Sequence, residues 1–226
     1  MLWDMDGTLV DTEPYWIEAE YALVAAHGRS WNDEHALNLV GNDLLVSAEY
    51  MRQHGGVDLE PAVIVELLLD GVIARIEQEV PWRPGAVELL AHLAEADVPC
   101  GLVTMSYERF VAPVLAMLPP GTFRAVVTGD RVSVGKPHPE PYLTAAGLLG
   151  VRPADCLAIE DSNTGAKSAV AAGCTALVVP NHVPVLEGER RVFRDSLVGL
   201  DASGLAAVLA AGSSEVAGHG ATGRTR

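Results

Sequence analysis

The chain has 226 residues, of which 49% are hydrophobic, and its 15 basic and 30 acidic residues give a net charge of −15. This length and apolar content exclude a disordered chain, and the shortage of basic residues argues against a nucleic-acid-binding protein, because such a protein needs a basic surface. The sequence has no apolar run of about 18 residues, the length that would predict a membrane span, and its first residues carry no leader pattern. We therefore expect a cytoplasmic protein.

The three cysteines, Cys100, Cys156 and Cys174, lie in or beside apolar runs. Their odd number and wide spacing favour buried, reduced thiols over a zinc site or a disulfide.

The sequence begins with a short apolar segment that predicts a buried strand ending near Met5. Because only three residues precede Asp4, we expect this strand to be short and upstream apolar residues to raise the melting temperature. A helical pattern then replaces it, without any strand signal. The expected helices cover 14–28, 30–41, 44–54 and 60–79, and Ser30 with Asp33 resembles a capping box.

After Pro84 the pattern alternates between short apolar runs and amphipathic segments, which is typical of βα units around a parallel sheet. The predicted strands are 99–104, 123–128, 155–159, 175–179 and 196–200, and the predicted helices are 85–96, 107–118, 140–149, 163–172 and 202–211. We therefore expect an α/β fold with a Rossmann-like core formed by 1–13 and 80–211, an inserted helical cap at 14–79, and a disordered tail at 212–226.

Acidic pairs follow two of these strands. Asp4 and Asp6 end the first strand, and Glu160 and Asp161 end the fourth. Strand alternation predicts that Asp4 and Asp6 point to the same side. Carboxylates gathered at a buried sheet edge repel one another unless a cation compensates, and a divalent metal accepts such oxygen ligands. Capped turns remain an alternative explanation for each pair taken alone.

Two further strand ends carry polar groups. Thr104 offers a hydroxyl before a helix start that can bind an anion, although a simple helix cap is the commoner role. Lys136 is one of only two lysines and lies between Gly135 and Pro137, which suggests a positioned charge, with a solvated loop side chain as an equal alternative. The carboxyl ends of parallel strands meet at one edge, so these groups predict a single site there.

Four stretches carry a family resemblance: DMDGTLVDTEPYW from Asp4, VTMS from Val103, GKPHPEPY from Gly135 and IEDSNTGAKSAVAAG from Ile159. In order and spacing the chain resembles, up to about residue 210, the haloacid dehalogenase-like hydrolases, in particular the phosphatase and β-phosphoglucomutase group with a helical cap.

The resemblance implies a role for each matching residue. Asp4 is the nucleophile that forms an aspartyl-phosphate, and Asp6 protonates the leaving oxygen and then activates water. Thr104, Met105 and Lys136 hold the phosphoryl group. Mg²⁺ is held by Asp4, Asp161 and the backbone carbonyl of Asp6, with Glu160 binding directly or through water.

Departures from related patterns narrow the reaction. Asp6 argues against the dehalogenases, which lack this aspartate, and the absence of lysine from 14–79 argues against the phosphonate hydrolases. The β-phosphoglucomutases carry a hinge histidine and a cap lysine, whereas this chain has Trp16 at the hinge and no cap lysine. We therefore predict a monomeric phosphatase of a small phosphorylated metabolite. A mutase-like phosphotransferase is the alternative, and a non-catalytic phosphometabolite-binding module is less favoured.

The substrate stays open among sugar phosphates, nucleotides and glycolate-type phosphates. The arginines of the predicted cap, any of which can contact a substrate phosphate, are Arg29, Arg52 and Arg75.

Overall fold

The computed structural model describes residues 1–39 and 42–219, with side chains described up to residue 210. Contacts divide the chain into two compact units. The sheet unit contains Met1–Val10, Trp82–Tyr107 and the chain from Leu118 onward, and the helical unit contains Asp11–Pro81 and Glu108–Met117.

The sheet unit is built on a parallel sheet with the strand order β3-β2-β1-β4-β5-β6. Leu2 of the central strand pairs with Gly101 on one side and with Ala158 on the other. This Rossmann-like parallel arrangement confirms the predicted fold class. The strands are β1 Leu2–Trp3, β2 Gly101–Val103, β3 Ala125–Val127, β4 Leu157–Glu160, β5 Thr175–Val178 and β6 Arg191–Phe193.

The edge strand β6 corrects one prediction, because the sequence favoured a last strand at 196–200. Arg191–Phe193 forms it instead, by pairing with β5 from Ala176 to Val178. Because its side chains are only half-buried, this edge strand does not need the apolar run that marks the central strands, and its sequence has none.

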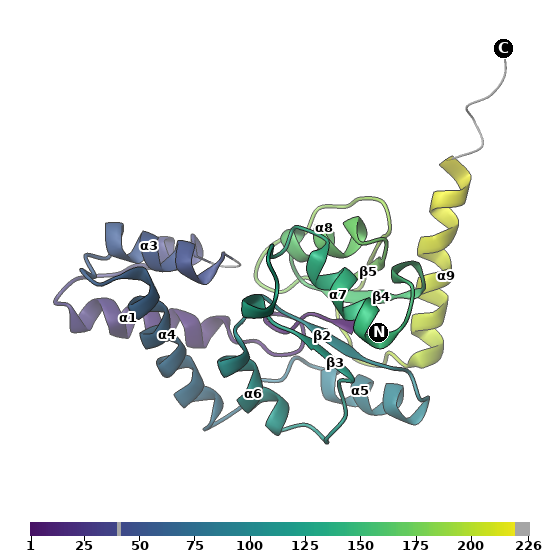
Figure 1. Cartoon of the computed structure of the whole chain (residues 1–226), viewed down its shortest axis with the longest axis horizontal. Helices are drawn as coiled ribbons and strands as arrows, with labels where there is room; N and C mark the ends of the chain where they lie inside the picture. The colour runs from purple at the N-terminus through teal and green to yellow at the C-terminus, as the bar shows by residue number, and fades with distance from the viewer. Residues whose placement is uncertain (40–41, 220–226) are drawn as a thin grey trace, which may run out of the picture. The chain divides into compact units, whose positions relative to one another are not determined.

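Helices cover both faces of the sheet. In Figure 1, α7 and α8 lie on one face and α5 on the other, where α9 contacts α5. The bounds are α5 Ala86–Glu95, α7 Glu140–Leu149, α8 Asn163–Ala171 and α9 Ala202–His219, with short 3-10 turns at Gly129–Arg131 and Pro153–Asp155. Helix α9 is longer than predicted, because it runs to His219 and so includes part of the segment expected to be a disordered tail. Residues 220–226 of that tail lie outside the described residues.

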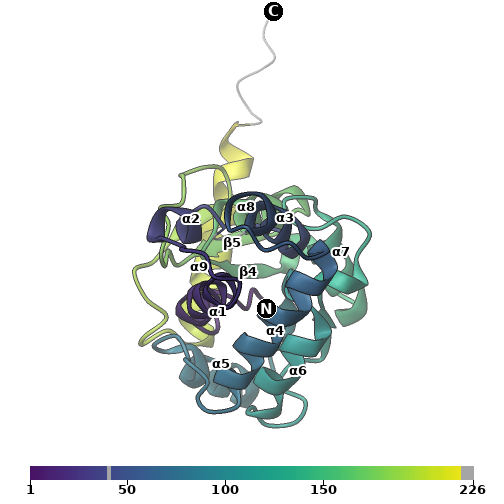
Figure 2. The same cartoon turned by 90° about the vertical axis from the view of Figure 1, so that its left-hand side faces the viewer.

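The helical unit consists of α1 Glu13–Ala26, α2 Asp33–Leu37, α3 Leu44–His54, α4 Pro61–Ile76 and α6 Glu108–Ala116. Helix α4 contacts α1, α3 and α6, which can be followed in Figure 2. The cap of α2 differs from the prediction, since the side chain of Asn32, not Ser30, accepts the hydrogen bond from the His35 amide.

Helix α6 was assigned to the core from sequence, but it groups with the helical unit. The Arg109 guanidinium pairs with Glu66, at 2.6 Å, and with Asp70, both on α4. The Phe110 ring packs edge-on against Trp16 of α1, with 5.6 Å between ring centroids. These contacts join α6 to a segment that lies far from it in the sequence.

Among the described residues, no helix has the length and apolar character needed to cross a membrane.

Candidate active site

The candidate site residues lie where neighbouring strands of the sheet unit end. Asp4 follows β1, Thr104 follows β2, and Glu160 ends β4 directly before Asp161. Lys136 comes from the loop that precedes α7. The parallel sheet therefore brings these sequence-distant residues to one edge, as predicted.

Lys136 is held by three acceptors. Its Nζ donates to Asp4 Oδ1 at 2.7 Å, to Glu160 Oε1 at 2.6 Å and to the carbonyl oxygen of Val103 at 2.9 Å. These bonds engage all three ammonium donors. Burial opposes the charge of this lysine, but the adjacent Asp4 and Glu160 carboxylates outweigh burial and raise its pKa. Lys136 is thus a fixed positive charge rather than a solvated loop side chain.

Three carboxylates form an acidic cluster, in which oxygens of Asp4, Glu160 and Asp161 lie within 4.8 Å of one another. Burial, reinforced by Glu160, raises the pKa of Asp4 to about 7. Burial, reinforced by Asp4, raises the pKa of Asp161 to about 9. One lysine therefore does not offset the negative charge that these groups carry when they are ionised.

The cluster fits a divalent cation. Its donors are all oxygens, and Asp4 Oδ2 is buried without a hydrogen-bond partner. A buried carboxylate oxygen without a partner is costly, and a hard cation such as Mg²⁺, bound by other oxygens of this cluster, would offset its charge.

Asp6 lies in a different hydrogen-bond environment from Asp4. Its Oδ2 accepts from Thr104 Oγ1 at 3.1 Å and from Ser106 Oγ at 2.7 Å, and its carboxylate is not part of the three-carboxylate cluster. Strand β1 itself ends at Trp3, and Asp6 lies beyond it, in an isolated bridge with Val10. The Thr104 hydroxyl, predicted to hold a phosphoryl group, orients Asp6.

Two glycines allow the acids to pack against bare backbone. Gly7 has a φ of +84°, and a Cβ added there would lie 1.9 Å from Asp161 Oδ2. A Cβ added at Gly165 would lie 1.9 Å from Glu160 Oε1. Any side chain at either position would displace a carboxylate of the cluster.

Glu160 is fixed by more partners than the sequence revealed. The Tyr142 hydroxyl donates to Glu160 Oε1 at 2.5 Å, and Ser162 Oγ donates to Oε2 at 3.1 Å. The Lys136 Nζ also lies 5.1 Å from the centroid of the Tyr142 ring. Tyr142 is fully buried on α7, so its place in the sequence resembles that of an ordinary core residue.

Ser106 and Tyr142 are the two site residues that sequence reasoning missed. Ser106 had a signal, because it lies two residues after Thr104 in the same VTMS stretch. Met105, predicted to bind phosphate, contacts the lysine loop in this structure, where its sulfur accepts from the Lys136 amide at 3.2 Å.

A parallel α/β sheet with an acidic cluster and a buried lysine at its carboxyl edge is the architecture of an enzyme that acts on phosphate esters, because that chemistry depends on positioning and charge stabilisation. The sequence profile of the haloacid dehalogenase-like hydrolases matches residues 1–173. The chain belongs to this family.

Relatives support this membership. The chain is 33% identical to hexitol phosphatase B of Escherichia coli (strain K12) over 79% of this chain and 82% of that protein. It is 32% identical to phosphoglycolate phosphatase 1 of Pseudomonas aeruginosa over 87% of this chain and 76% of that protein. The relatives are phosphatases, and this chain is a phosphoric monoester hydrolase of the same family.

Solved structures share the fold. CbbY from Rhodobacter sphaeroides in complex with phosphate is 26% identical and has a TM-score of 0.81, with 91% of this chain and 97% of that chain covered. The β-phosphoglucomutase from Clostridium difficile has a TM-score of 0.76 at 21% identity, covering 93% of this chain and 96% of that chain, and it shows likeness of fold alone.

Proposed function

We propose that the chain is a Mg²⁺-dependent phosphatase that hydrolyses the phosphate monoester of a small sugar or polyol through an aspartyl-phosphate on Asp4. The state of Asp4 is the observation that carries the proposal. Lys136 holds its Oδ1 at 2.7 Å, while its buried Oδ2 has no hydrogen-bond partner. One oxygen is thereby fixed and the other is free to act as a nucleophile.

In the first step, Asp4 Oδ2 attacks the phosphorus atom of the ester. The bond between phosphorus and the alcohol oxygen breaks, and Asp6 gives its proton to that oxygen, so the alcohol leaves. Thr104 and Ser106 both donate to Asp6 Oδ2, which fixes the carboxyl group that transfers the proton.

In the second step, water attacks the phosphorus atom of the aspartyl-phosphate. Asp6, now ionised, takes a proton from this water, and the bond between phosphorus and Asp4 breaks. Inorganic phosphate and the Asp4 carboxylate are the products. Lys136 offsets negative charge beside Asp4 throughout, in a buried site where an ionic interaction is stronger than in water.

The residues that would hold Mg²⁺ are Asp4, Asp161 and the backbone carbonyl of Asp6, with Glu160 binding directly or through water. When bound, the cation supplies charge compensation that lets a carboxylate approach an anionic phosphate.

Hexitol phosphatases and phosphoglycolate phosphatases among the relatives support a small phosphorylated substrate.

We also propose that the helical unit acts as a cap that selects this substrate. Two of its arginines already have acidic partners, since Arg52 lies 2.8 Å from Glu49 and Arg75 lies 3.0 Å from Glu18.

The helical unit lacks the hinge histidine and the lysine of a mutase, which favours hydrolysis over phosphoryl transfer to a sugar. Trp16 lies at the hinge position, where it packs against Phe110 and cannot relay a proton as a histidine can. Residues 14–79 contain no lysine. The intermediate should therefore pass its phosphoryl group to water.

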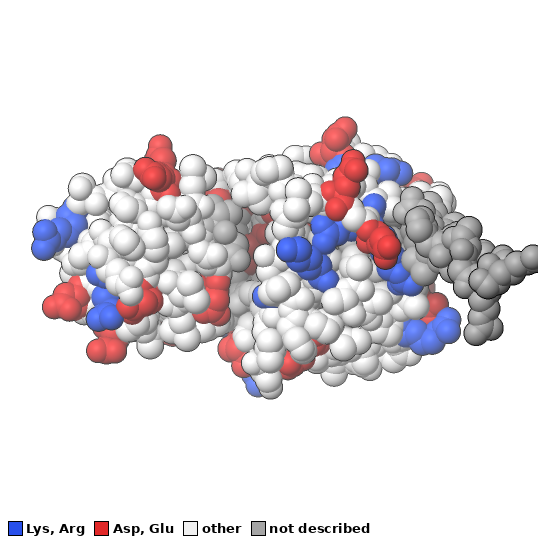
Figure 3. Space-filling view, turned by 90° about the horizontal axis from the view of Figure 1, so that it is seen from above, with Lys and Arg blue, Asp and Glu red and all other residues white. Residues whose placement is uncertain are grey.

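We also propose that the enzyme works in the cytoplasm as a monomer and without nucleic acid. The net charge of −15 supports the last point. On the face shown in Figure 3, basic side chains are interspersed with acidic ones and with large uncharged areas.

A substrate panel with a trapping experiment tests the proposal. We expect phosphate release from hexitol or hexose phosphates to exceed release from nucleotides, and to stop in EDTA. Acid quenching with ³²P-labelled substrate should leave a base-labile label on the wild type and none on Asp4→Asn. Label retained by Asp4→Asn, or full activity in EDTA, would contradict the mechanism.

The mutase alternative has its own test. With glucose 1-phosphate and a bisphosphate primer, we expect phosphate release and little glucose 6-phosphate. Isomer formation about tenfold faster than phosphate release, a difference of about 1.4 kcal/mol in barrier height, would restore the mutase assignment.

A further inference from the structure

Two of the three cysteines lie side by side at the amino ends of β4 and β5. Leu157 pairs with Thr175 in this parallel pair, and the Thr175 amide donates to the carbonyl of Cys156 at 3.1 Å. Cys156 and Cys174 precede these two residues, so they are neighbours across the strand pair. Neighbouring strands lie about 4.8 Å apart, within the separation that a disulfide spans.

Cys156 Sγ donates to the carbonyl oxygen of Arg152 at 3.5 Å. The neighbouring Cys174 thiol lowers the pKa of Cys156, and Cys156 together with burial raises the pKa of Cys174. Both side chains belong to the apolar cluster beneath α7 and α8, which holds them in place.

We propose that Cys156 and Cys174 form an oxidisable dithiol, which a hydroperoxide converts into a disulfide between β4 and β5. The nucleophile is Cys156, which directly follows the turn Pro153–Asp155, where Ala154 and Asp155 are exposed. Cys174 is fully buried and is the resolving thiol.

The chemistry balances in two steps. The Cys156 thiol gives up its proton and its sulfur attacks one peroxide oxygen. The O–O bond breaks, the proton ends on the leaving oxygen, and a sulfenic acid and one molecule of water or alcohol form. The Cys174 sulfur then attacks the Cys156 sulfur, the S–O bond breaks, the Cys174 thiol proton joins the leaving hydroxide as water, and the S–S bond forms. The two sulfurs lose two electrons in all, and the peroxide takes them.

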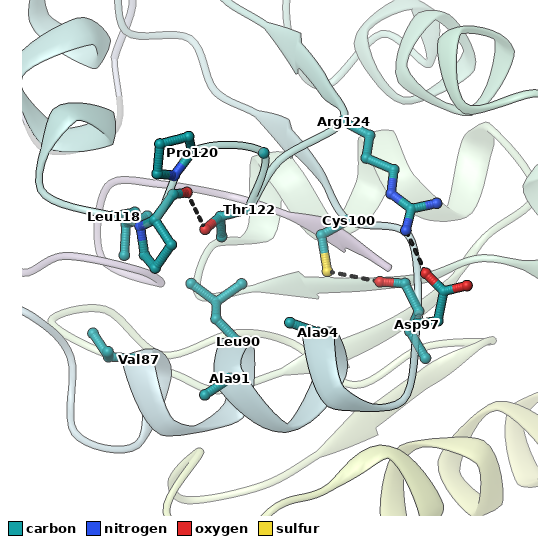
Figure 4. Close-up of a pocket in the computed structure, with 13 residues that line it drawn as sticks. Val87, Leu90, Ala91, Ala94, Asp97, Cys100, Leu118, Pro120, Thr122 and Arg124 are labelled. Carbon is teal, nitrogen blue, oxygen red and sulfur yellow. Dashed lines mark hydrogen bonds and ion pairs between the residues drawn. The ribbon is translucent and has the colours of Figure 1, made fainter.

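Cys100 provides an internal control, because it is buried but has no cysteine neighbour. It precedes β2, which β1 separates from β4, so about 10 Å lies between the strands that carry Cys100 and Cys156. Figure 4 shows its thiol facing a groove of about 240 Å³ beside Leu90 of α5, and its Sγ donates to the Val98 carbonyl at 3.6 Å.

The dithiol lies at the opposite end of β4 from Glu160. A bond there closes a loop that contains β4, α8 and the site residues Glu160 and Asp161, but the two sulfurs lie at the far end of β4 from those residues. We therefore expect oxidation to leave the rate of phosphate-ester hydrolysis within twofold of the reduced enzyme and to raise the melting temperature by about 5 °C, since a cross-link restricts the unfolded chain.

The test uses the full chain, reduced and then freed of reductant, with hydrogen peroxide as the oxidant. Thiol titration after denaturation should fall from three thiols to one, and a non-reduced digest should contain one cross-linked peptide that joins Cys156 to Cys174. Dithiothreitol should reverse both changes. Near-UV circular dichroism recorded during oxidation establishes that the bond forms in the folded protein.

Matched variants complete the experiment. Cys100→Ser should form the cross-link as the wild type does, and Cys156→Ser and Cys174→Ser should not. Three free thiols after peroxide treatment, sulfinic acid at Cys156 without a cross-link, a cross-link to Cys100, or a bond that forms only after the near-UV signal is lost would each overturn the proposal. The wild-type digest alone decides the matter if a variant fails to fold.

Discussion

At the scale of single residues, the carboxylate of Glu160 connects most of the polar groups of the site. It accepts hydrogen bonds from Lys136 and Tyr142 at Oε1 and from Ser162 at Oε2. Ser162 also accepts from the Gly165 amide at 3.0 Å, which caps α8. These hydrogen bonds fix the position of the buried Glu160 carboxylate.

Removing the Tyr142 hydroxyl should loosen this arrangement without emptying the core. In Tyr142→Phe we expect the Mg²⁺ concentration that gives half-saturation to rise at least about tenfold, because a hydrogen bond to a charged group contributes about 1.5–3 kcal/mol and about 1.4 kcal/mol corresponds to a factor of ten. Calorimetric titration with Mg²⁺ measures the change. Tyr142→Leu, which also removes the ring, is the comparison, and equal Mg²⁺ affinity in wild type and Tyr142→Phe would contradict the role of the hydroxyl.

Gly7 should be equally sensitive. Alanine there would adopt an unfavourable positive φ and would place Cβ 1.9 Å from Asp161 Oδ2, so the carboxylate must move. We expect Gly7→Ala to lose at least about tenfold in kcat, on the order of 1.4 kcal/mol. Gly121→Ala is a matched control, since Gly121 also has a positive φ but a Cβ there meets nothing within 4 Å. Similar losses of activity in the two variants would contradict the steric argument.

At the scale of elements, a buried glutamate on α1 makes the stability of the fold dependent on pH. Glu20 is 5% exposed, and its Oε2 accepts from Trp31 Nε1 at 3.1 Å. Burial raises the pKa of Glu20 to about 8, although the bond from Trp31 opposes the shift. Because the folded pKa lies above the unfolded value of 4.5, this group destabilises the fold progressively as the pH rises from 4.5 to 8.

Glu20→Gln should remove this dependence while keeping an oxygen for Trp31. We expect the variant to melt above the wild type, with a difference that is larger at pH 8 than at pH 5.5. Glu49→Gln is the control of opposite sign, because the hydrogen bond from Arg52 lowers the pKa of Glu49 to about 2. The stabilising effect of Glu49 is complete above its unfolded pKa of 4.5, so the drop in melting temperature caused by Glu49→Gln should be the same at both pH values. A Glu20→Gln gain that does not grow with pH would contradict the assignment.

The sequence predicted those helices and strands that are determined by the apolar pattern of their own residues. The central strands have apolar runs, and Asp4 and Asp161 directly follow strands, where polar residues are conspicuous. The prediction failed where the placement of an element depends on contacts with residues that are distant in the sequence. Strand β6 exists because β5 pairs with it, and α6 groups with α4 because Arg109 finds partners about forty residues earlier.

The candidate site shows the same division. Tyr142 could not be found from sequence, because an aromatic residue on the buried side of a helix is ordinarily a packing residue. Its hydroxyl acquires a role only because the sheet order brings β4 beside β1, and with it Glu160 beside Lys136 and Asp4.

At the scale of the whole molecule, the acidic cluster links metal binding to stability. The folded pKa of Asp4 is about 7 and that of Asp161 about 9, both above the unfolded value of 3.8. Ionisation of these groups therefore disfavours the metal-free fold, and stability should fall as the pH rises from about 4 toward 9. A cation that binds the ionised carboxylates should offset this loss.

We expect the melting temperature in EDTA to be lower at pH 8.5 than at pH 6. Saturating Mg²⁺ should raise it more at pH 8.5 than at pH 6, as differential scanning calorimetry can measure. Asp161→Asn, which replaces one carboxylate, should lose most of this Mg²⁺ effect. A Mg²⁺ shift that is equal at both pH values, or larger at pH 6, would show that these carboxylates are not the ligands.

The grouping of α6 with the helical unit has a consequence for how this enzyme can be recombined with its relatives. The chain changes unit four times, after Val10, Pro81, Tyr107 and Met117. A graft of 11–81 alone would leave behind Phe110, which packs on Trp16, and Arg109, which pairs with α4. A transfer of the intact helical unit would therefore have to include two separate stretches of the chain, 11–81 and 108–117.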